Sequence, residues 1–247
     1  MQRERLEELA KAIRAALEHD ERVNLHRSPI HVKVEDELIV LEGEAEDICT
    51  KRTAARIAHQ VAEGAPVADR VRLIPAERPE KHDEIDGRIR DEVVTAFMDE
   101  PVFRDHDLFV VEKGERRRLR DLTPEDGEIT IAVDHGVVTL EGKVRSLTHR
   151  RLAEVLAWWT AGVVQVENHL QVVPPEEEND GELADAIEMI LERDPMIHRD
   201  NLIVTVKDHT VRVTGSVASP EEKALVLRDL CYIPGVHEIE DAIEVRH

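Results

Sequence analysis

The chain has 247 residues, of which 41% are hydrophobic and only 2% aromatic, so its cores must be small and built mainly from Val, Ile, Leu and Ala. A net charge of -21 favours solubility and argues against nonspecific binding to nucleic acid or to anionic membranes. This length fits one large domain or two to three small ones, and an internal repeat favours the second.

The two cysteines and the first residues bear on localisation. Cys49 and Cys231 occupy non-equivalent positions, and so small a number suits a reducing compartment, although one isolated bridge remains open. The first twenty residues are charged and helical in pattern, and the chain has no run of 18 apolar residues. These features predict a soluble cytoplasmic protein.

The first repeat reads as helix, strand, strand, helix, strand. An apolar stripe predicts the first helix, at Leu6, Leu9, Ala10, Ile13, Ala16 and Leu17. Alternation predicts strands at 30–34 and 39–45 around a turn at 35–37. A helix follows from about Asp47, whose carboxylate is placed to cap it, and a last strand covers 67–74.

The same pattern recurs twice, separated by linkers rich in proline and charge. Gly43, Gly142 and Gly215 each stand 30 residues before an apolar residue near the end of their repeat. The predicted organisation is repeat 1 at 1–75, a linker at 76–83, repeat 2 at 84–173 with an insertion at about 103–128, an acidic linker at 174–180, and repeat 3 at 181–247.

The three glycines fall on the core-facing side of their strands. A glycine there lacks a side chain, and we expect this to let a helix cross the sheet closely. Their predicted role is therefore structural.

The pattern resembles the BON domain, named for bacterial osmotic-stress and nodulation proteins. The resemblance rests on the alternating strand, on the V-x-L-x-G-x-V stretch at 138–144, and on the Gly-Val that follows an Ala-containing helix. That last element is present at Gly162-Val163 and Gly235-Val236, whereas repeat 1 has Gly64-Ala65, shifted by one position. The resemblance covers nearly the whole chain as three copies.

The resemblance implies an α+β fold of three tandem αββαβ domains, each with two helices packed on a three-stranded mixed sheet. It also implies a non-enzymatic binding role, because family members are associated with envelope integrity, phospholipid contact, osmotic stress or assembly into larger machines. Several members are exported, but this chain shows no export signal. A cytosolic member binds potassium and carries a LysM module, which is not found here.

Repeat 2 departs most from the other copies. Val102 and Ile129 are separated by 27 positions along the chain, whereas the corresponding Val23 and Ile30 of repeat 1 are separated by 7. The added stretch 108–114 predicts a strand running into a hairpin turn. Four arginines follow immediately, at Arg116, Arg117, Arg118 and Arg120. They can bind phosphate or carboxylate groups, or they can neutralise the chain's own acidic surface, which is the favoured interpretation.

Trp158 and Trp159 are the second departure. Adjacent helical residues point about 100° apart, so at least one indole should lie at the edge of the buried face or outside it. With Arg145, Arg150 and Arg151 nearby, these residues form a candidate site for a protein partner or an anionic phospholipid. Packing between repeats of the same chain is the favoured alternative.

No other motif indicates chemistry. The thirteen histidines include no H-E-x-x-H arrangement, the acidic turns lack a calcium-loop pattern, and no nucleophile elbow, P-loop or dinucleotide fingerprint is present. We therefore expect no enzyme, no cofactor and no metal centre. The sequence predicts a stress- or envelope-linked adaptor that binds mainly through repeat 2, with a potassium-responsive protein or an oligomer-building scaffold as alternatives.

Overall fold

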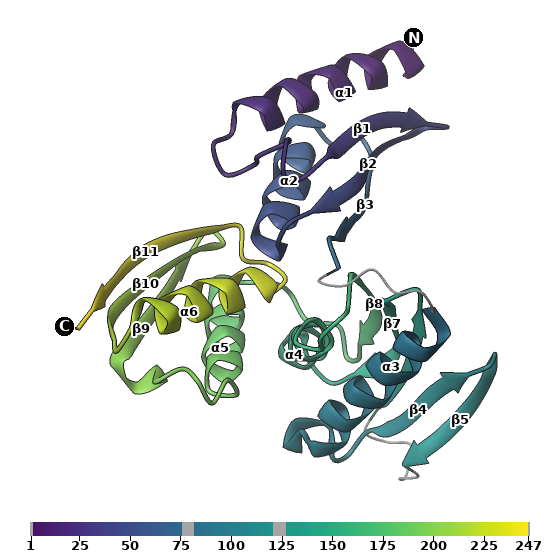
Figure 1. Cartoon of the computed structure of the whole chain (residues 1–247), viewed down its shortest axis with the longest axis vertical. Helices are drawn as coiled ribbons and strands as arrows, with labels where there is room; N and C mark the ends of the chain where they lie inside the picture. The colour runs from purple at the N-terminus through teal and green to yellow at the C-terminus, as the bar shows by residue number, and fades with distance from the viewer. Residues whose placement is uncertain (1, 76–81, 121–126, 247) are drawn as a thin grey trace. The chain divides into compact units, whose positions relative to one another are not determined.

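The computed structural model describes residues 2–75, 82–120 and 127–246. The chain divides into two compact units, 1–74 and 75–247, and each is described by itself (Figure 1). The first unit contains repeat 1, and the second contains repeats 2 and 3.

Repeat 1 has the predicted order of elements. They are α1 (Gln2–His19), β1 (Ile30–Glu35), β2 (Leu38–Ala45), α2 (Ile48–Val61) and β3 (Val67–Leu73). β1 runs antiparallel to β2, and β2 runs parallel to β3. A parallel pair requires a crossover, which α2 supplies, so the sheet is mixed as predicted.

The core of repeat 1 is aliphatic. Leu9, Ile13 and Leu17 of α1 are buried with Ile39 and Leu41 of β2. The predicted cap of α2 is confirmed, because the carboxylate of Asp47 accepts the backbone N–H of Thr50 at 2.7 Å.

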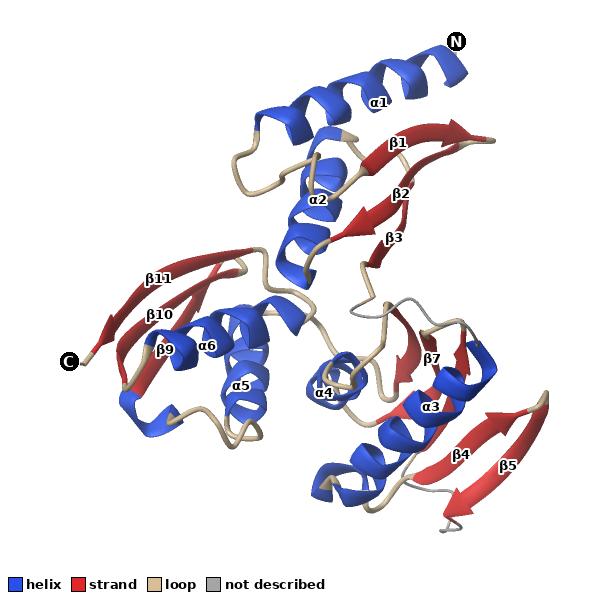
Figure 2. Cartoon of the chain, viewed as in Figure 1, coloured by secondary structure: helices blue, strands red, loops and turns tan. Residues whose placement is uncertain are grey.

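The second unit contains two further helix–sheet repeats (Figure 2). Repeat 2 consists of α3 (His82–Asp99), η1 (Pro101–Phe103), β4 (Asp107–Glu112), β5 (Glu115–Arg120), β6 (Glu128–Asp134), β7 (Val137–Val144), α4 (Leu147–Trp158) and β8 (Gln165–Val172). Repeat 3 consists of α5 (Asp180–Leu191), η2 (Arg199–Asn201), β9 (Leu202–Lys207), β10 (Thr210–Val217), α6 (Pro220–Tyr232) and β11 (Glu238–Val245).

The insertion enlarges the sheet of repeat 2. The predicted strand and hairpin turn are confirmed as β4 and β5, and β4 pairs in parallel with β6. The described strands of repeat 2 therefore form a five-stranded sheet in the order β5-β4-β6-β7-β8, whereas the sheets of repeats 1 and 3 have three strands.

The physical reason predicted for the repeated glycines is wrong. Gly142 has φ +130°, and a Cβ there would lie 2.1 Å from the backbone oxygen of Glu128 on the neighbouring strand. Gly43 and Gly215 meet backbone oxygens in the same way. The glycine is needed because its positive φ would turn a Cβ into the backbone of the chain beside it in the sheet, not because a helix crosses it.

The helices and cysteines bear on the predicted localisation. No helix among the described residues is long and apolar enough to cross a membrane. Neither Cys49 nor Cys231 is a free thiol. The cysteines therefore do not support the reducing compartment that their number suggested.

Candidate binding site

The hairpin added to repeat 2 ends in an edge strand that carries the predicted arginines. Among the described strands β5 pairs with β4 alone. Arg116 lies opposite Val111 and Arg118 lies opposite Phe109, and a bulge then interrupts the register. The four residues 115–118 thus form the regular part of an edge whose outer backbone groups have no strand beside them in the described chain.

Arg116 and Arg118 lie on the sheet face that points away from the helices. Leu108 and Val110 of β4 pair with the core residues Ile129 and Ile131, so Phe109 between them faces the opposite side. The guanidinium carbons of the two arginines lie 3.5 and 5.1 Å from the centre of the Phe109 ring. These contacts cover the ring and orient both cations.

The same arginines also contact acceptors within repeat 2. Arg116 lies 3.2 Å from Glu128, Arg117 lies 3.7 Å from Glu112, and Arg118 lies 3.2 Å from the buried Asp107. The side chains of Arg116, Arg117 and Arg118 nevertheless remain 45%, 61% and 46% exposed. The pairs of Arg116 and Arg117 are exposed on both sides and therefore weak, so these two cations stay available to a partner, whereas Arg118 also neutralises the buried Asp107.

Arg120 differs from the other three. It is half-buried and donates to the backbone oxygen of Phe103 at 2.5 Å and to that of Met98 at 3.0 Å. These bonds tie β5 to the end of α3 and to η1. Arg120 therefore holds the hairpin in place, whereas the other three form its surface.

The two tryptophans lie at the junction of repeats 2 and 3, where α4 packs against α5 and α6. Trp158 is 5% exposed and stacks on Tyr232, with ring centres 6.1 Å apart. The indole N–H of Trp159 lies 3.3 Å from Oδ1 of Asp229, which accepts it. In this arrangement Trp158 does not present a surface that a lipid headgroup can reach.

Arg151 belongs to the same junction. It is 3% exposed and donates to both carboxylate oxygens of Glu182, at 3.2 and 2.9 Å, and to the backbone oxygen of Pro234. A Cβ on Gly235 would lie 2.5 Å from Arg151 Nη1, so that glycine leaves room for an arginine of the neighbouring repeat. Burial of a bidentate pair makes Arg151 a structural cation rather than an external binding residue.

The acidic linker takes part in the junction. Glu176 accepts the backbone N–H of Leu147, the first residue of α4, at 2.8 Å. A carboxylate at this place is favoured by the helix dipole. The Glu178 carboxylate lies 3.7 Å from Arg151. The linker is thus attached to repeat 2, which helps to join repeats 2 and 3 into one unit.

Asp229 is the buried acid of the junction. Its side chain is fully enclosed, and this burial, together with a hydrogen bond to Asp194, raises its pKa to about 7. The bond from Trp159 opposes the shift. Sequence reasoning missed both Asp229 and Glu182, because each contacts a residue of another repeat and no local pattern marks such a pair.

The two predicted arginine groups are not brought together. Arg151 and the tryptophans face repeat 3, whereas Arg145 is exposed before α4 and Arg150 is half-buried within it. The backbone oxygen of Arg150 accepts a bond from Asn168 at 2.9 Å. Of the predicted arginines on the described strands, Arg116, Arg117 and Arg118 are consecutive on β5 and each remains 45% or more exposed.

The hairpin turn of each repeat is a further place where the copies differ. In repeat 2, Asp86 of α3 accepts the backbone N–H groups of His135 and Gly136, both at 2.8 Å. In repeat 3, Asp180 accepts those of Asp208 and His209, at 2.7 and 3.0 Å. We call this arrangement the aspartate clamp.

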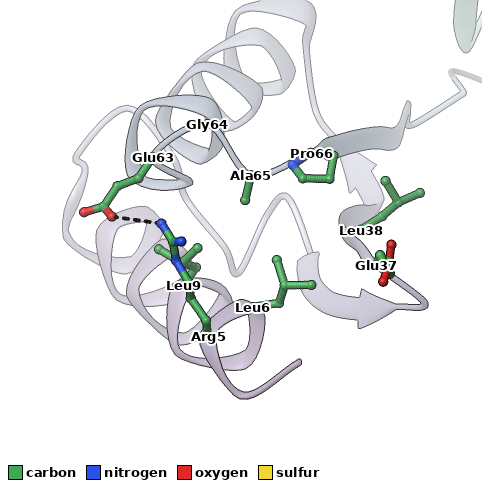
Figure 3. Close-up of a pocket in the computed structure, with 9 residues that line it drawn as sticks. All are labelled: Arg5, Leu6, Leu9, Glu37, Leu38, Glu63, Gly64, Ala65 and Pro66. Atoms are coloured by element: carbon green, nitrogen blue, oxygen red, sulfur yellow. Dashed lines mark ion pairs between the residues drawn. The ribbon is translucent and has the colours of Figure 1, made fainter. Parts of the chain in front are cut away.

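Repeat 1 has Leu6 at the clamp position, three residues before the core residue Leu9. A pocket of about 370 Å³ lies between the first helix and this hairpin turn (Figure 3). The pocket is lined by Arg5, Leu6, Leu9, Glu37, Leu38, Glu63, Gly64, Ala65 and Pro66. Arg5 and Glu63 form an ion pair of 3.8 Å beside it. This mixture of polar and apolar groups does not identify one class of ligand.

Asp86 also belongs to a small group with metal-binding atoms. Its carboxylate, that of Asp134 and the imidazole of His135 offer ligand atoms within 4.8 Å of one another. Both oxygens of Asp86 already accept backbone N–H groups, and the other two residues are exposed. The aspartate clamp therefore explains why these three side chains lie close together, without a metal ion.

Comparison with known proteins identifies the family. The BON domain family model matches residues 5–75, 116–174 and 179–247. Comparison with curated proteins gave no match. Among solved structures, the chain is similar to two structures of CdsD, a structural protein of the type III secretion system of Chlamydia trachomatis, one of them of its C-terminal domain.

The two structural similarities are weak. The C-terminal domain of CdsD is 11% identical, with coverage of 95% of this chain and 96% of that chain and a TM-score of 0.25. The second is 12% identical, with coverage of 95% and 92% and a TM-score of 0.24. At these values the similarity carries no argument about function. The family matches span most of the chain, and each falls on one of its three helix–sheet repeats, although the second begins only at β5 and leaves out α3 and β4. The protein therefore belongs to the BON domain family and contains three tandem BON domains.

Proposed function

We propose that the chain is a non-enzymatic binding and scaffold protein that contacts an acidic surface of a protein partner through the β4–β5 hairpin of repeat 2. One observation carries the proposal: β5 is an edge strand with three exposed arginines, Arg116, Arg117 and Arg118, on a chain of net charge -21. Such an edge offers backbone hydrogen bonds and positive charge together.

A protein partner is favoured over an anionic phospholipid. Trp158 and Arg151, which the sequence suggested as lipid contacts, are buried at the junction. The overall negative charge also repels an anionic membrane at long range. An edge strand is suited to adding a strand from another protein, whereas a lipid headgroup gains nothing from it.

The junction supports the scaffold part of the proposal. Arg151–Glu182, Trp158–Tyr232 and the linker contacts join repeats 2 and 3, so the hairpin is attached to a larger body than one small domain. A stress- or envelope-linked adaptor, as the family resemblance implies, fits this arrangement.

Native co-purification with quantitative mass spectrometry tests the proposal. The variant Arg116→Glu with Arg117→Glu reverses the exposed edge and leaves Arg118 beside the buried Asp107. The matched control is Arg70→Glu with Arg72→Glu on β3, which changes the net charge equally on another edge strand. We expect the β5 variant to lose its partner at least tenfold and the control to keep it.

Equal recovery with both variants would contradict the proposal. Flotation of the same proteins with phosphatidylglycerol vesicles covers the lipid alternative. We expect none of these proteins to float with the vesicles. If the natural protein and the β3 control float and the β5 variant does not, the ligand of the basic edge is a phospholipid rather than a protein.

A further inference from the structure

Two of the edge strands of the second unit carry opposite charge. β11 is an edge strand of repeat 3 and pairs with β10 alone among the described strands. Three glutamates are exposed along it, Glu238, Glu240 and Glu244. β5, an edge strand of repeat 2, carries Arg116, Arg117 and Arg118. β5 is thus a basic edge of the second unit, and β11 is an acidic one.

The glutamates of β11 lie on the face of the sheet that the helices leave uncovered. Asp241, on the alternate side, contacts Lys223 of α6 at 2.8 Å, and Ile243 is buried. Glu238 and Glu240 therefore point away from α6, since successive strand residues face opposite sides. They occupy the same kind of face as Arg116 and Arg118 on β5.

The spacing of the charges also matches. Arg116 and Arg118 are two residues apart, as are Glu238 and Glu240. If β5 were to lie beside β11 in either direction, one register would place both arginines opposite both glutamates. Directly opposed residues of unlike charge stabilise a strand pair, and like charges destabilise it.

Edge strands of opposite charge favour pairing between unlike strands of two copies. Two β5 edges repel each other, as do two β11 edges, so symmetric pairing through either strand is disfavoured. A contact between β5 and β11 of different copies satisfies the outer backbone groups of both strands and pairs their charges.

We propose that β5 of one copy pairs with β11 of a second copy and joins the sheet of repeat 2 to the sheet of repeat 3. The inference rests on the proposed function, because it names a second copy of this chain as a partner of the same basic edge. The contact is heterologous, so copies add head to tail and the assembly closes into a ring or grows as a filament.

The existing ion pairs of Glu240 and Arg116 permit such a contact, whereas Arg118 is 46% exposed and also lies 3.2 Å from the buried Asp107. Arg212 of β10 lies 3.7 Å from Glu240, with both side chains more than half exposed. Arg116 is paired with Glu128, with both side chains 45% exposed. Pairs this exposed contribute little and exchange readily, so an opposing strand can replace them.

Repeat 1 offers the comparison within the same chain. β3 is also an edge strand and carries the exposed Arg70 and Arg72. Arg70 lies 2.7 Å from Glu35 of β1. Because β3 has the same type of charge, its reversal separates a specific β5 contact from a general effect of added negative charge.

Sedimentation velocity of the full chain over a range of concentrations tests the proposal. We expect the average mass to rise with concentration at about 50 mM salt and to fall toward the monomer at about 500 mM. The basic-edge variant, Arg116→Glu with Arg117→Glu, and the acidic-edge variant, Glu238→Arg with Glu240→Arg, should each stay monomeric.

An equal mixture of the two variants is the decisive sample. The basic-edge variant keeps a native β11 and the acidic-edge variant keeps a native β5, so the mixture retains one intact contact and should form at least a dimer. Arg70→Glu with Arg72→Glu should associate like the natural protein. Circular dichroism checks that every variant is folded, and glutamine at the same positions replaces any variant that is not.

Several results would overturn the proposal: a natural protein that stays monomeric at all concentrations, variants that associate undiminished, or a mixture that stays monomeric. Loss of association in the β3 control would also overturn it. A monomeric protein that still loses its co-purified partner on Arg116→Glu with Arg117→Glu would remove this inference and leave the proposed function standing. A protein that associates with itself as expected but co-purifies with no other protein would support this inference and remove the separate partner from the proposed function.

Discussion

At the scale of single residues, the junction of repeats 2 and 3 depends on charged groups that are withdrawn from water. Arg151 is paired with both oxygens of Glu182, and Asp229 is enclosed beside Asp194 and Trp159. A buried ion pair gains little over apolar packing, but removing one partner is costly because the other charge is left behind. Asp229 has only a long contact of 3.9 Å with Arg228, and its burial and its bond to Asp194 outweigh that charge, so its pKa is raised.

Asp229 predicts how the stability of the junction depends on pH. Its pKa is about 7 in the folded chain and about 3.9 in an unfolded one, so the folded state binds more protons between these values. The free energy of unfolding should therefore fall as pH rises from about 4 to 7, by up to about 4 kcal/mol, and level off above. Asp229→Asn should remove this part of the slope and stabilise the junction at pH 8.

Tryptophan fluorescence during urea unfolding measures this effect, because both tryptophans lie at the junction. The exposed Asp91 provides the matched control, and Asp91→Asn should keep the natural slope. If Asp229→Asn and the natural protein show the same slope between pH 5 and pH 8, the buried acid has been assigned the wrong role.

At the scale of elements, the three repeats share a frame and differ in how the hairpin turn is held. The aspartate clamp binds the turn to the first helix in repeats 2 and 3, and Leu6 cannot do so in repeat 1. Backbone bonds from His209 and Asp208 hold the pKa of Asp180 below its usual range, and a carboxylate with a lowered pKa stabilises the fold above that range and loses its effect as pH falls.

Hydrogen exchange should report the clamp directly. Asp180→Ala should speed exchange of the Asp208 and His209 amides by about tenfold or more, because their acceptor is lost. Leu6→Ala should leave the Asp36 and Glu37 amides unchanged, because Leu6 has no polar atom with which to hold them. An unchanged rate in the Asp180 variant would mean that water replaces the carboxylate fully.

At the scale of the whole molecule, three repeats form two compact units. The acidic linker and the α4 contacts join repeats 2 and 3, whereas the stretch at 76–81 lies outside the described residues. Cooperativity should follow these contacts, with repeats 2 and 3 unfolding together.

Arg151→Ala should uncouple the two repeats. Glu182 would be left half-buried without its cation, at a cost of about 3–5 kcal/mol. Calorimetry should then show repeats 2 and 3 melting at separate temperatures, whereas Arg150→Ala, a neighbour outside the junction, should keep one transition. A single transition in both variants would show that the ion pair does not couple the repeats.

The sequence by itself determined the repeated frame. Apolar alternation in strands, apolar stripes in helices, the Asp47 cap and the recurring glycine are local patterns, and each depends on residues a few positions apart. For this reason the αββαβ order, the mixed sheet and the hairpin of the insertion were predicted correctly. The reason given for the glycine was wrong, because the atom it avoids belongs to the neighbouring strand.

Only the tertiary structure decided what the distinctive residues of repeat 2 do. Charge and aromatic character grouped the β5 arginines with the tryptophan helix, but Arg151 and Trp158 turn toward repeat 3 and Arg116 to Arg118 face solvent. Arg151 pairs with Glu182, 31 positions further along the chain, and Trp158 stacks on Tyr232, 74 positions further along. Contacts of that range depend on how folded repeats pack, which local patterning does not encode.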